Sequence, residues 1–184
     1  MYWCPYLEAF LKSSEWILNP NFTIEKVVQY FYWDFKSVLT EELVFRGAIL
    51  YILINKIGSS KAILLSATLF GIYHWFSFGV FGNIVPMFFV FIGTGTMGYA
   101  WALAFSKTKS ILLPLGLHLG WNFTVNTIFS KGPLGEGLLI SQGGGEITQL
   151  FSLVGLCLIP ILVLIYVRFF VFDESNIYNQ NRKV

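Results

Sequence analysis

Five ionisable side chains lie within the long apolar runs between residues 36 and 131, and their types suit acid–base chemistry. They are two adjacent acids, one arginine and the only two histidines of the chain, namely Glu41, Glu42, Arg46, His74 and His118. The remaining bases of this stretch are lysines in the short segments between apolar runs. An ionisable side chain inside a membrane costs about 2.5 to 3.5 kcal/mol and is rare unless it has a function. We therefore expect these five residues to form a buried polar site.

Helical spacing separates the roles of the two adjacent acids. Residues four positions apart share one face of a helix, whereas adjacent residues point about 100° apart. Glu42 and Arg46 are therefore placed to pair with each other, which neutralises both charges inside the bilayer. Glu41 points elsewhere and keeps an unpaired carboxylate, the kind of group that general-base catalysis requires.

The same spacing of four residues occurs twice more along the chain. Phe70 and His74 share one helix face, and His118 and Asn122 share a face of a later helix. The second pair would direct an imidazole and an amide toward one point in space. These pairs add an aromatic ring and an amide to the candidate site.

Composition and run length predict that this site lies in an all-α integral membrane protein. Of the 184 residues, 55% are hydrophobic and only 12% are charged, which leaves too little polar surface for an ordinary soluble domain. A membrane-spanning helix needs about 20 predominantly apolar residues. Five segments meet this requirement, at residues 37–55, 62–80, 84–105, 110–130 and 147–171. Because the loops between them are short, we expect one multi-pass antiparallel bundle in the cell membrane, with residues 1–184 forming a single domain.

The N-terminal segment, residues 1–34, differs from these runs because charged residues interrupt it too often for a span. We predict two amphipathic helices there, rich in Trp and Tyr, at the membrane interface. The core helices then cover residues 37–130, and a C-terminal transmembrane helix covers residues 147–171. In the fourth apolar segment, Gly116 and Gly120 predict a close approach by another helix.

Charge and cysteine content argue against two other kinds of site. The net charge of +2 is small and no cluster of Lys and Arg is present, so we expect no nucleic-acid partner. Cys4 and Cys157 lie far apart in the chain and fit no metal-binding spacing. We expect the lipid bilayer to surround the protein. We expect the site to need no cofactor.

Three short motifs follow one another on successive apolar segments. Residues 41–46 read EExxxR, residues 70–74 read FxxxH and residues 118–122 read HxxxN. In this order they resemble the CPBP family of intramembrane proteases, also called the CAAX-protease and bacteriocin-processing or Abi family. Each motif alone is weak, but three in order that use both histidines are specific. The resemblance covers about residues 37–130.

The resemblance implies catalytic roles for four residues. Glu41 would be the general base that activates a water molecule, and His74 would hold that water or share its proton. His118 and Asn122 would donate hydrogen bonds to the oxyanion of the tetrahedral intermediate. Such a donor is usually worth a factor of about 10² to 10³ in rate.

The resemblance also implies supporting roles for three neighbours. Glu42 with Arg46 would fix the helix and the local electric field, and Phe70 would pack the site and shield it.

A segment from Lys131 to Glu146 contains six glycines, and we predict that it is flexible enough to act as a substrate gate.

We therefore predict an intramembrane endopeptidase that hydrolyses a peptide bond in a membrane-anchored or lipidated peptide or protein. The substrate class stays open among a lipidated C-terminal peptide, a bacteriocin-like leader and another membrane-anchored protein. One alternative is a zinc-dependent version of the same protease, with Glu41, His74 and His118 as ligands. No HExxH or other close-spaced ligand pair supports it. The other alternative is a non-enzymatic immunity-type membrane protein or a proton-coupled transporter, which would leave the motif at residues 118–122 unexplained.

Overall fold

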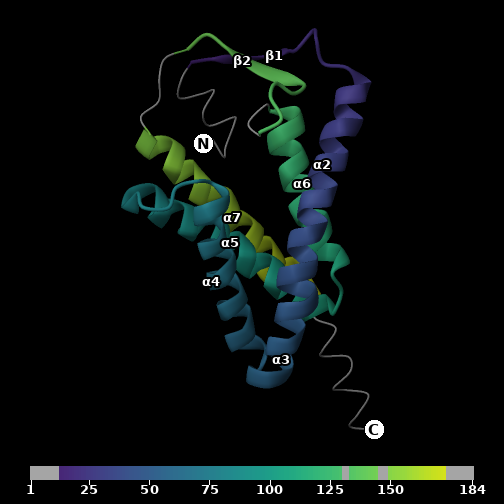
Figure 1. The fold of residues 1–184 in the computed structure, drawn as a ribbon, viewed down its shortest axis with the longest axis vertical. Helices are drawn as coiled ribbons and strands as arrows, with labels where there is room; N and C mark the ends of the chain where they lie inside the picture. Colours follow the sequence, from purple (N-terminus) through teal and green to yellow (C-terminus); the bar gives the residue numbers. More distant parts are fainter. Residues whose placement is uncertain (1–12, 130–132, 145–148, 173–184) are drawn as a thin grey trace.

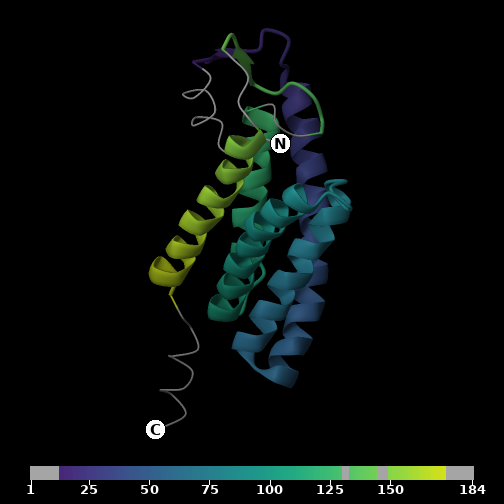
Figure 2. The same cartoon turned by 90° about the vertical axis from the view of Figure 1, so that its left-hand side faces the viewer.

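A computed structural model describes residues 13–129, 133–144 and 149–172 of the protein. Most of these residues are helical, and the helices run side by side along the long axis of the molecule (Figures 1 and 2). The helical elements are α2 (Ile24–Glu42), η1 (Leu43–Leu50), α3 (Tyr51–Ile57), α4 (Ser59–Ser77), α5 (Ile84–Thr108), α6 (Leu112–Phe123), η2 (Thr124–Ile128) and α7 (Gln149–Phe170). Helix α4 packs on α5, α5 packs on α7, and α2 packs on α6. The predicted helical fold is thus confirmed in its main part.

The first long helix begins earlier than the sequence predicts. It runs without interruption from Ile24 to Ile57 through α2, the π-helical segment η1 and α3. Thr23 caps its start by accepting a hydrogen bond from the backbone N–H of Lys26. The expected start of the first core helix at residue 37 is therefore wrong, and residues 13–34 do not form two separate helices. A location of this segment at the membrane interface stays a prediction, and residues 1–12 lie outside the described residues. The charges that interrupt the hydropathy of this region do not interrupt the helix, because Glu25 is exposed and Asp34 is buried with a hydrogen-bond partner, the amide of Asn126.

The buried face of α2 repeats every four residues. Its buried side chains are Tyr30, Asp34, Val38 and Glu42, and this stripe faces the bundle. A period of four residues keeps side chains on one side of a helix over several turns. The stripe brings Glu42 into the interior, and Glu41 lies beside it at the edge of a cavity.

Two short strands at one end of the bundle are not predicted by the sequence (Figure 1). Strand β1 (Glu15–Leu18) pairs antiparallel with β2 (Leu139–Gln142), with Glu15 opposite Gln142 and Leu18 opposite Leu139. Such short strands are stabilised only by the partner segment, here more than a hundred residues away, so no local pattern reveals them.

The same pairing constrains most of the segment predicted to be a flexible gate. The Tyr30 hydroxyl donates to the carbonyl of Leu134 at 2.7 Å, and the Asn19 side chain donates to the carbonyl of Gly137 at 3.0 Å. The backbone N–H of Leu138 donates to the carbonyl of Thr127 at 2.8 Å. Residues 133–144 are therefore tied to β1, α2 and η2, whereas residues 131, 132, 145 and 146 lie outside the described residues.

Close helix packing occurs at other glycines than the predicted ones. A Cβ atom at Gly71 would lie 2.8 Å from the Phe91 ring, and one at Gly98 would lie 2.9 Å from the Phe70 ring. These two glycines let α4 and α5 approach closely. At Gly116 and Gly120 no described atom lies within 4 Å of such a Cβ. The predicted packing face of α6 is therefore wrong within the described residues, because small residues permit a close approach but do not require one.

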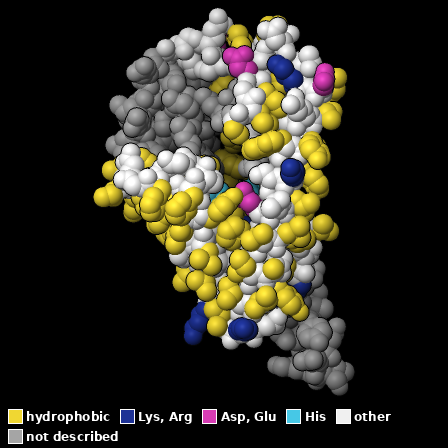
Figure 3. All heavy atoms as spheres, in the orientation of Figure 1, with side chains coloured by type: hydrophobic (Ala, Val, Ile, Leu, Met, Phe, Trp, Pro, Cys, Tyr) yellow, Lys and Arg dark blue, Asp and Glu magenta, His cyan; other side chains and the backbone are white. Residues whose placement is uncertain are grey.

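The exterior of the bundle is rich in large apolar side chains. Exposed examples include Leu64 on α4, Ile84 and Phe88 on α5, and Phe169 on α7. Figure 3 shows such side chains over much of one face, with few charged groups among them. Among the described helices, α5 is long and apolar enough to cross a membrane by length and composition, and Cys157–Phe170 is a shorter apolar stretch. An apolar exterior suits lipid, while the number of five spans stays a prediction.

Candidate active site

The predicted site residues line one cavity of about 330 Å³ between α2, α4, α5 and α6. Its walls include all four residues predicted to be catalytic together with Phe70, namely Glu41, Phe70, His74, His118 and Asn122. Acidic and histidine side chains are visible in the hollow of the face drawn in Figure 3. The three motifs therefore meet at one cavity, although Glu41 and Asn122 are 81 positions apart in the sequence.

The pairing of Glu42 with Arg46 is confirmed. Oε1 of Glu42 lies 3.0 Å from Nη1 of Arg46, and both side chains are completely buried. The guanidinium also donates to the carbonyl of Gly98 at 3.3 Å and lies over the Phe70 ring at 4.3 Å. These contacts connect η1 to α4 and α5, so the ion pair fixes three elements around the cavity.

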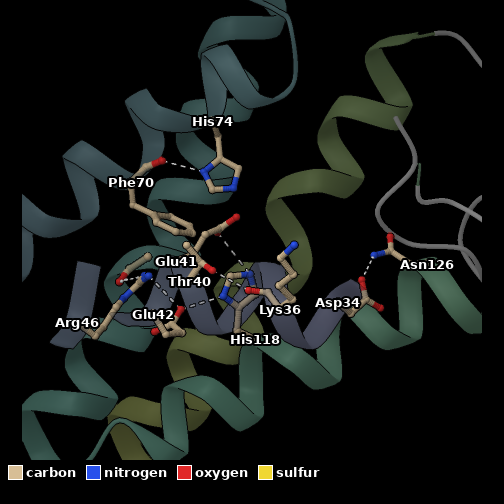
Figure 4. Close-up of polar contacts among 11 residues, drawn as sticks. Asp34, Lys36, Thr40, Glu41, Glu42, Arg46, Phe70, His74, His118 and Asn126 are labelled. Atoms are coloured by element: carbon tan, nitrogen blue, oxygen red, sulfur yellow. Dashed lines mark hydrogen bonds and ion pairs between the residues drawn. The ribbon is translucent and has the colours of Figure 1, made fainter. Parts of the chain in front are cut away.

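Glu42 has a second partner that the sequence does not indicate. Nδ1 of His118 lies 2.8 Å from Oε1 of Glu42 (Figure 4). A carboxylate paired with arginine can only accept, so the proton of this hydrogen bond belongs to Nδ1. The other ring nitrogen, Nε2, then points toward Glu41, with Oε2 of that residue 3.9 Å away. Glu42 thus determines that Nε2, and not Nδ1, of His118 faces Glu41.

His74 is oriented by its own helix. Its Nδ1 lies 2.8 Å from the carbonyl oxygen of Phe70, one turn earlier on α4. Because a carbonyl oxygen only accepts, Nδ1 carries the proton and Nε2 is the nitrogen left for other partners. The Phe70 ring lies 4.4 Å from the His74 ring and 6.1 Å from the His118 ring, measured between centroids. Phe70 therefore packs against both histidines, the position that its predicted shielding role requires.

Glu41 is the acid of the adjacent pair that lines the cavity. Its side chain is 17% exposed, whereas that of Glu42 is 0% exposed. Oε2 of Glu41 accepts no hydrogen bond from any residue that the structure describes. Asn122 lines the same cavity one turn after His118, so an amide joins the carboxylate and the imidazoles there.

Two π-helical segments adjoin the site. Segment η1 starts directly after Glu42 and contains Arg46, and η2 starts two residues after Asn122. A π-helix inserts extra backbone into a turn, and such segments are frequent at functional sites. Here the irregular backbone overlaps the motif at residues 41–46 and starts just after the motif at residues 118–122.

Two further polar or aromatic groups at the cavity were missed by sequence reasoning. Asp34 is completely buried and accepts a hydrogen bond from the amide of Asn126, which lines the cavity. Its spacing of eight residues from Glu42 is the signal that could have placed it on the buried face. Trp101 on α5 also lines the cavity, and its ring is stacked on that of His118. Helix α5 carries no motif, so nothing in the sequence singles Trp101 out.

The zinc-dependent alternative names Glu41, His74 and His118 as ligands, and all three line the cavity. Within residues 13–129, 133–144 and 149–172, no three His, Cys, Asp or Glu side chains come together as a metal-binding group. Both Nδ1 atoms are engaged, that of His118 with Glu42 and that of His74 with a backbone carbonyl, which leaves both Nε2 atoms available. A histidine that binds a metal through Nε2 makes the same kind of hydrogen bond at Nδ1, so these two bonds do not distinguish a metal site from a metal-free one. The zinc-dependent reading thus stays an alternative, and we derive no step through a metal.

An apolar helical bundle with carboxylate, imidazole and amide groups around one cavity has the features expected of an intramembrane protease. The family model described as type II CAAX prenyl endopeptidase Rce1-like matches residues 23–124, more than half of the chain. The chain belongs to this family, and the predicted membership of the CAAX proteases is confirmed. It is a membrane-embedded peptidase that acts on a membrane-associated protein substrate, and the match includes every predicted site residue. No curated protein and no solved structure matches the chain.

Proposed function

We propose that the protein is a multi-pass intramembrane endopeptidase of the cell membrane in which Glu41 activates the attacking water without a cofactor. The observation that carries this proposal is the position of Glu41, which lines the cavity and whose buried Oε2 accepts no hydrogen bond from the described residues. Nε2 of His118 lies 3.9 Å away, and His74 lines the same space. A base placed in this way contributes typically about 10² to 10⁴ in rate.

The charges of the buried cluster give a proton count for this mechanism. With Glu41 and Glu42 ionised and Arg46 cationic, the cluster carries one negative charge in excess. One added proton, on Glu41 or on Nε2 of His118, makes it neutral, and a neutral cluster is favoured in a low-dielectric interior. The two atoms lie on either side of a 3.9 Å gap, so a bridging water or a small movement can carry the proton between them.

The reaction then follows in two steps that conserve protons. The water oxygen bonds to the carbonyl carbon of the scissile peptide while Glu41 takes one water proton, and His74 holds the water through Nε2. The intermediate collapses, the carbon–nitrogen bond breaks, and the proton on Glu41 passes to the departing amine nitrogen. This sequence uses Glu41 first as a base and then as an acid.

The oxyanion of the intermediate would be stabilised by His118 and Asn122. The amide of Asn122 can donate in every protonation state. Nε2 of His118 can donate only when the ring carries two protons, since the Nδ1 proton is directed at Glu42. The carboxylate of Glu42 stabilises that doubly protonated ring, so we assign Glu42 and Arg46 to the support of His118.

The proposed substrate is a lipidated C-terminal peptide of a membrane-anchored protein. Family membership and the aromatic lining of the cavity, which includes Trp33, Phe78 and Trp121, support an apolar substrate segment. Membership in an endopeptidase family argues against the transporter and immunity-protein alternatives.

The test is cleavage of a library of membrane peptides by purified protein in lipid vesicles. The library includes prenylated and unprenylated C-terminal peptides, and mass spectrometry identifies the bond that is cut. We expect cleavage of a lipidated member by the wild type and none by Glu41→Ala. A library left intact by the wild type, or cut equally by both proteins, would refute the proposed function.

A further inference from the structure

Trp101 forms the closest ring contact of the site. Its indole is stacked on the imidazole of His118, with centroids 4.0 Å apart and ring planes 18° from parallel. The side chain is 2% exposed and borders the cavity. It comes from α5, whereas His118 comes from α6, so the stack joins two helices at the site.

The indole is itself held in place from several sides. Its ring meets that of Phe70 edge to face at 5.6 Å, and the guanidinium of Arg46 lies 5.3 Å from its centroid. Trp101 also belongs to a buried cluster with Phe45, Phe70 and Met97. A ring packed in this way has one orientation, and it imposes that orientation on the imidazole stacked against it.

The Glu42 hydrogen bond alone does not fix the His118 ring. A bond at Nδ1 sets one end of the imidazole but leaves the ring able to tilt about that end. A flat stack on indole removes this tilt and keeps Nε2 directed toward Glu41. The electron-rich face of Trp also attracts a positively charged ring more strongly than other aromatic faces do.

We propose that Trp101 is a positioning residue that holds the His118 imidazole in its working plane and stabilises its doubly protonated form. This inference rests on the proposed function, because it concerns the histidine that stabilises the oxyanion. The role assigned to Trp101 acts through the imidazole that it contacts. Its effect therefore falls on turnover, kcat, rather than on substrate binding.

The kinetic experiment compares Trp101→Leu, which removes the aromatic face, with Trp101→Phe, which keeps one. The control is Phe105→Leu, a buried aromatic of the same helix in a separate cluster. We expect Trp101→Leu to lower kcat by about tenfold or more with KM within about threefold of wild type. Trp101→Phe should retain roughly a third or more of wild-type kcat, since it keeps a weaker aromatic face. Phe105→Leu should keep wild-type kcat even where its thermal stability falls equally.

A second measurement does not depend on activity. The chain has only two histidines, so the ring signals of isotopically labelled histidine are assigned by comparison with His74→Gln. The indole face should shift the ring protons of His118 upfield in the wild type, and Trp101→Phe should reduce that shift.

The outcomes separate this inference from the proposed function. A wild type that cleaves in a Glu41-dependent way while Trp101→Leu keeps full kcat would overturn the role of Trp101 alone. An unshifted His118 signal in the wild type would do the same, even if Trp101→Leu fails to fold. Absence of Glu41-dependent cleavage in the wild type would overturn the proposed function and this inference with it.

Discussion

Glu42, and not Glu41, holds the imidazole of His118, with 2.8 Å between Oε1 and Nδ1. The same carboxylate oxygen accepts from Arg46 at 3.0 Å. Two adjacent acids on one helix therefore face different partners, one in a closed network and one at the edge of a cavity. This division leaves Glu41 available for chemistry while Glu42 organises the groups around it.

The buried pair of Glu42 and Arg46 predicts non-additive effects on stability. Removing one partner leaves an uncompensated buried charge, so Glu42→Ala and Arg46→Ala should each lower the free energy of unfolding by about 3 to 5 kcal/mol. The double variant should recover part of this loss, measured by thermal unfolding in the same detergent. A double variant whose loss equals the sum of the two single losses would show that the residues do not interact. Activity should stay low in the double variant, because His118 has lost its acceptor.

Substitution of Asn122 should lower the turnover number, kcat, and leave KM nearly unchanged. As a donor to the oxyanion it acts only in the transition state, so Asn122→Ala should lower kcat by about 10² to 10³ with little change in KM. Asn55→Ala is the matched control, because Asn55 is exposed and donates to the carbonyl of Tyr51 in its own helix. A rise in KM at constant kcat would assign Asn122 to substrate binding instead.

Metal removal distinguishes the cofactor-free mechanism from the zinc-dependent one. If Glu41 and His74 activate water alone, exhaustive chelation should leave kcat/KM unchanged. Elemental analysis of active protein should then find far less than one equivalent of zinc. Stoichiometric zinc that is lost with activity, and restores activity on return, would establish the zinc-dependent alternative.

Spacing within single helices is the part of the structure that the sequence predicts well. Glu42 and Arg46 pair because four residues make about one helical turn, and the pair is confirmed even though η1 is π-helical. The convergence of His74, His118 and Asn122 on the cavity of Glu41 was also predicted, because each motif occupies a separate apolar helix.

Contacts between distant segments are the part that could not be predicted. The Glu42 to His118 hydrogen bond joins residues 76 positions apart, and either histidine could have been its partner. The stack of Trp101 on His118 and the pairing of β1 with β2 likewise depend on how the elements pack. The early start of α2 was missed because Glu25, Lys26 and Asp34 lower the hydropathy of this region without ending the helix.

The most direct test of the mechanism is the single substitution Glu41→Gln, which keeps the size of the side chain and removes its basicity. The control is Glu25→Gln, an exposed acid on the same helix. With a lipidated peptide that the wild type cleaves, Glu41→Gln should lose at least about 10² in kcat at unchanged thermal stability, whereas Glu25→Gln should match the wild type. A folded Glu41→Gln protein that retains more than about a tenth of wild-type kcat would contradict the assignment of Glu41 as the general base.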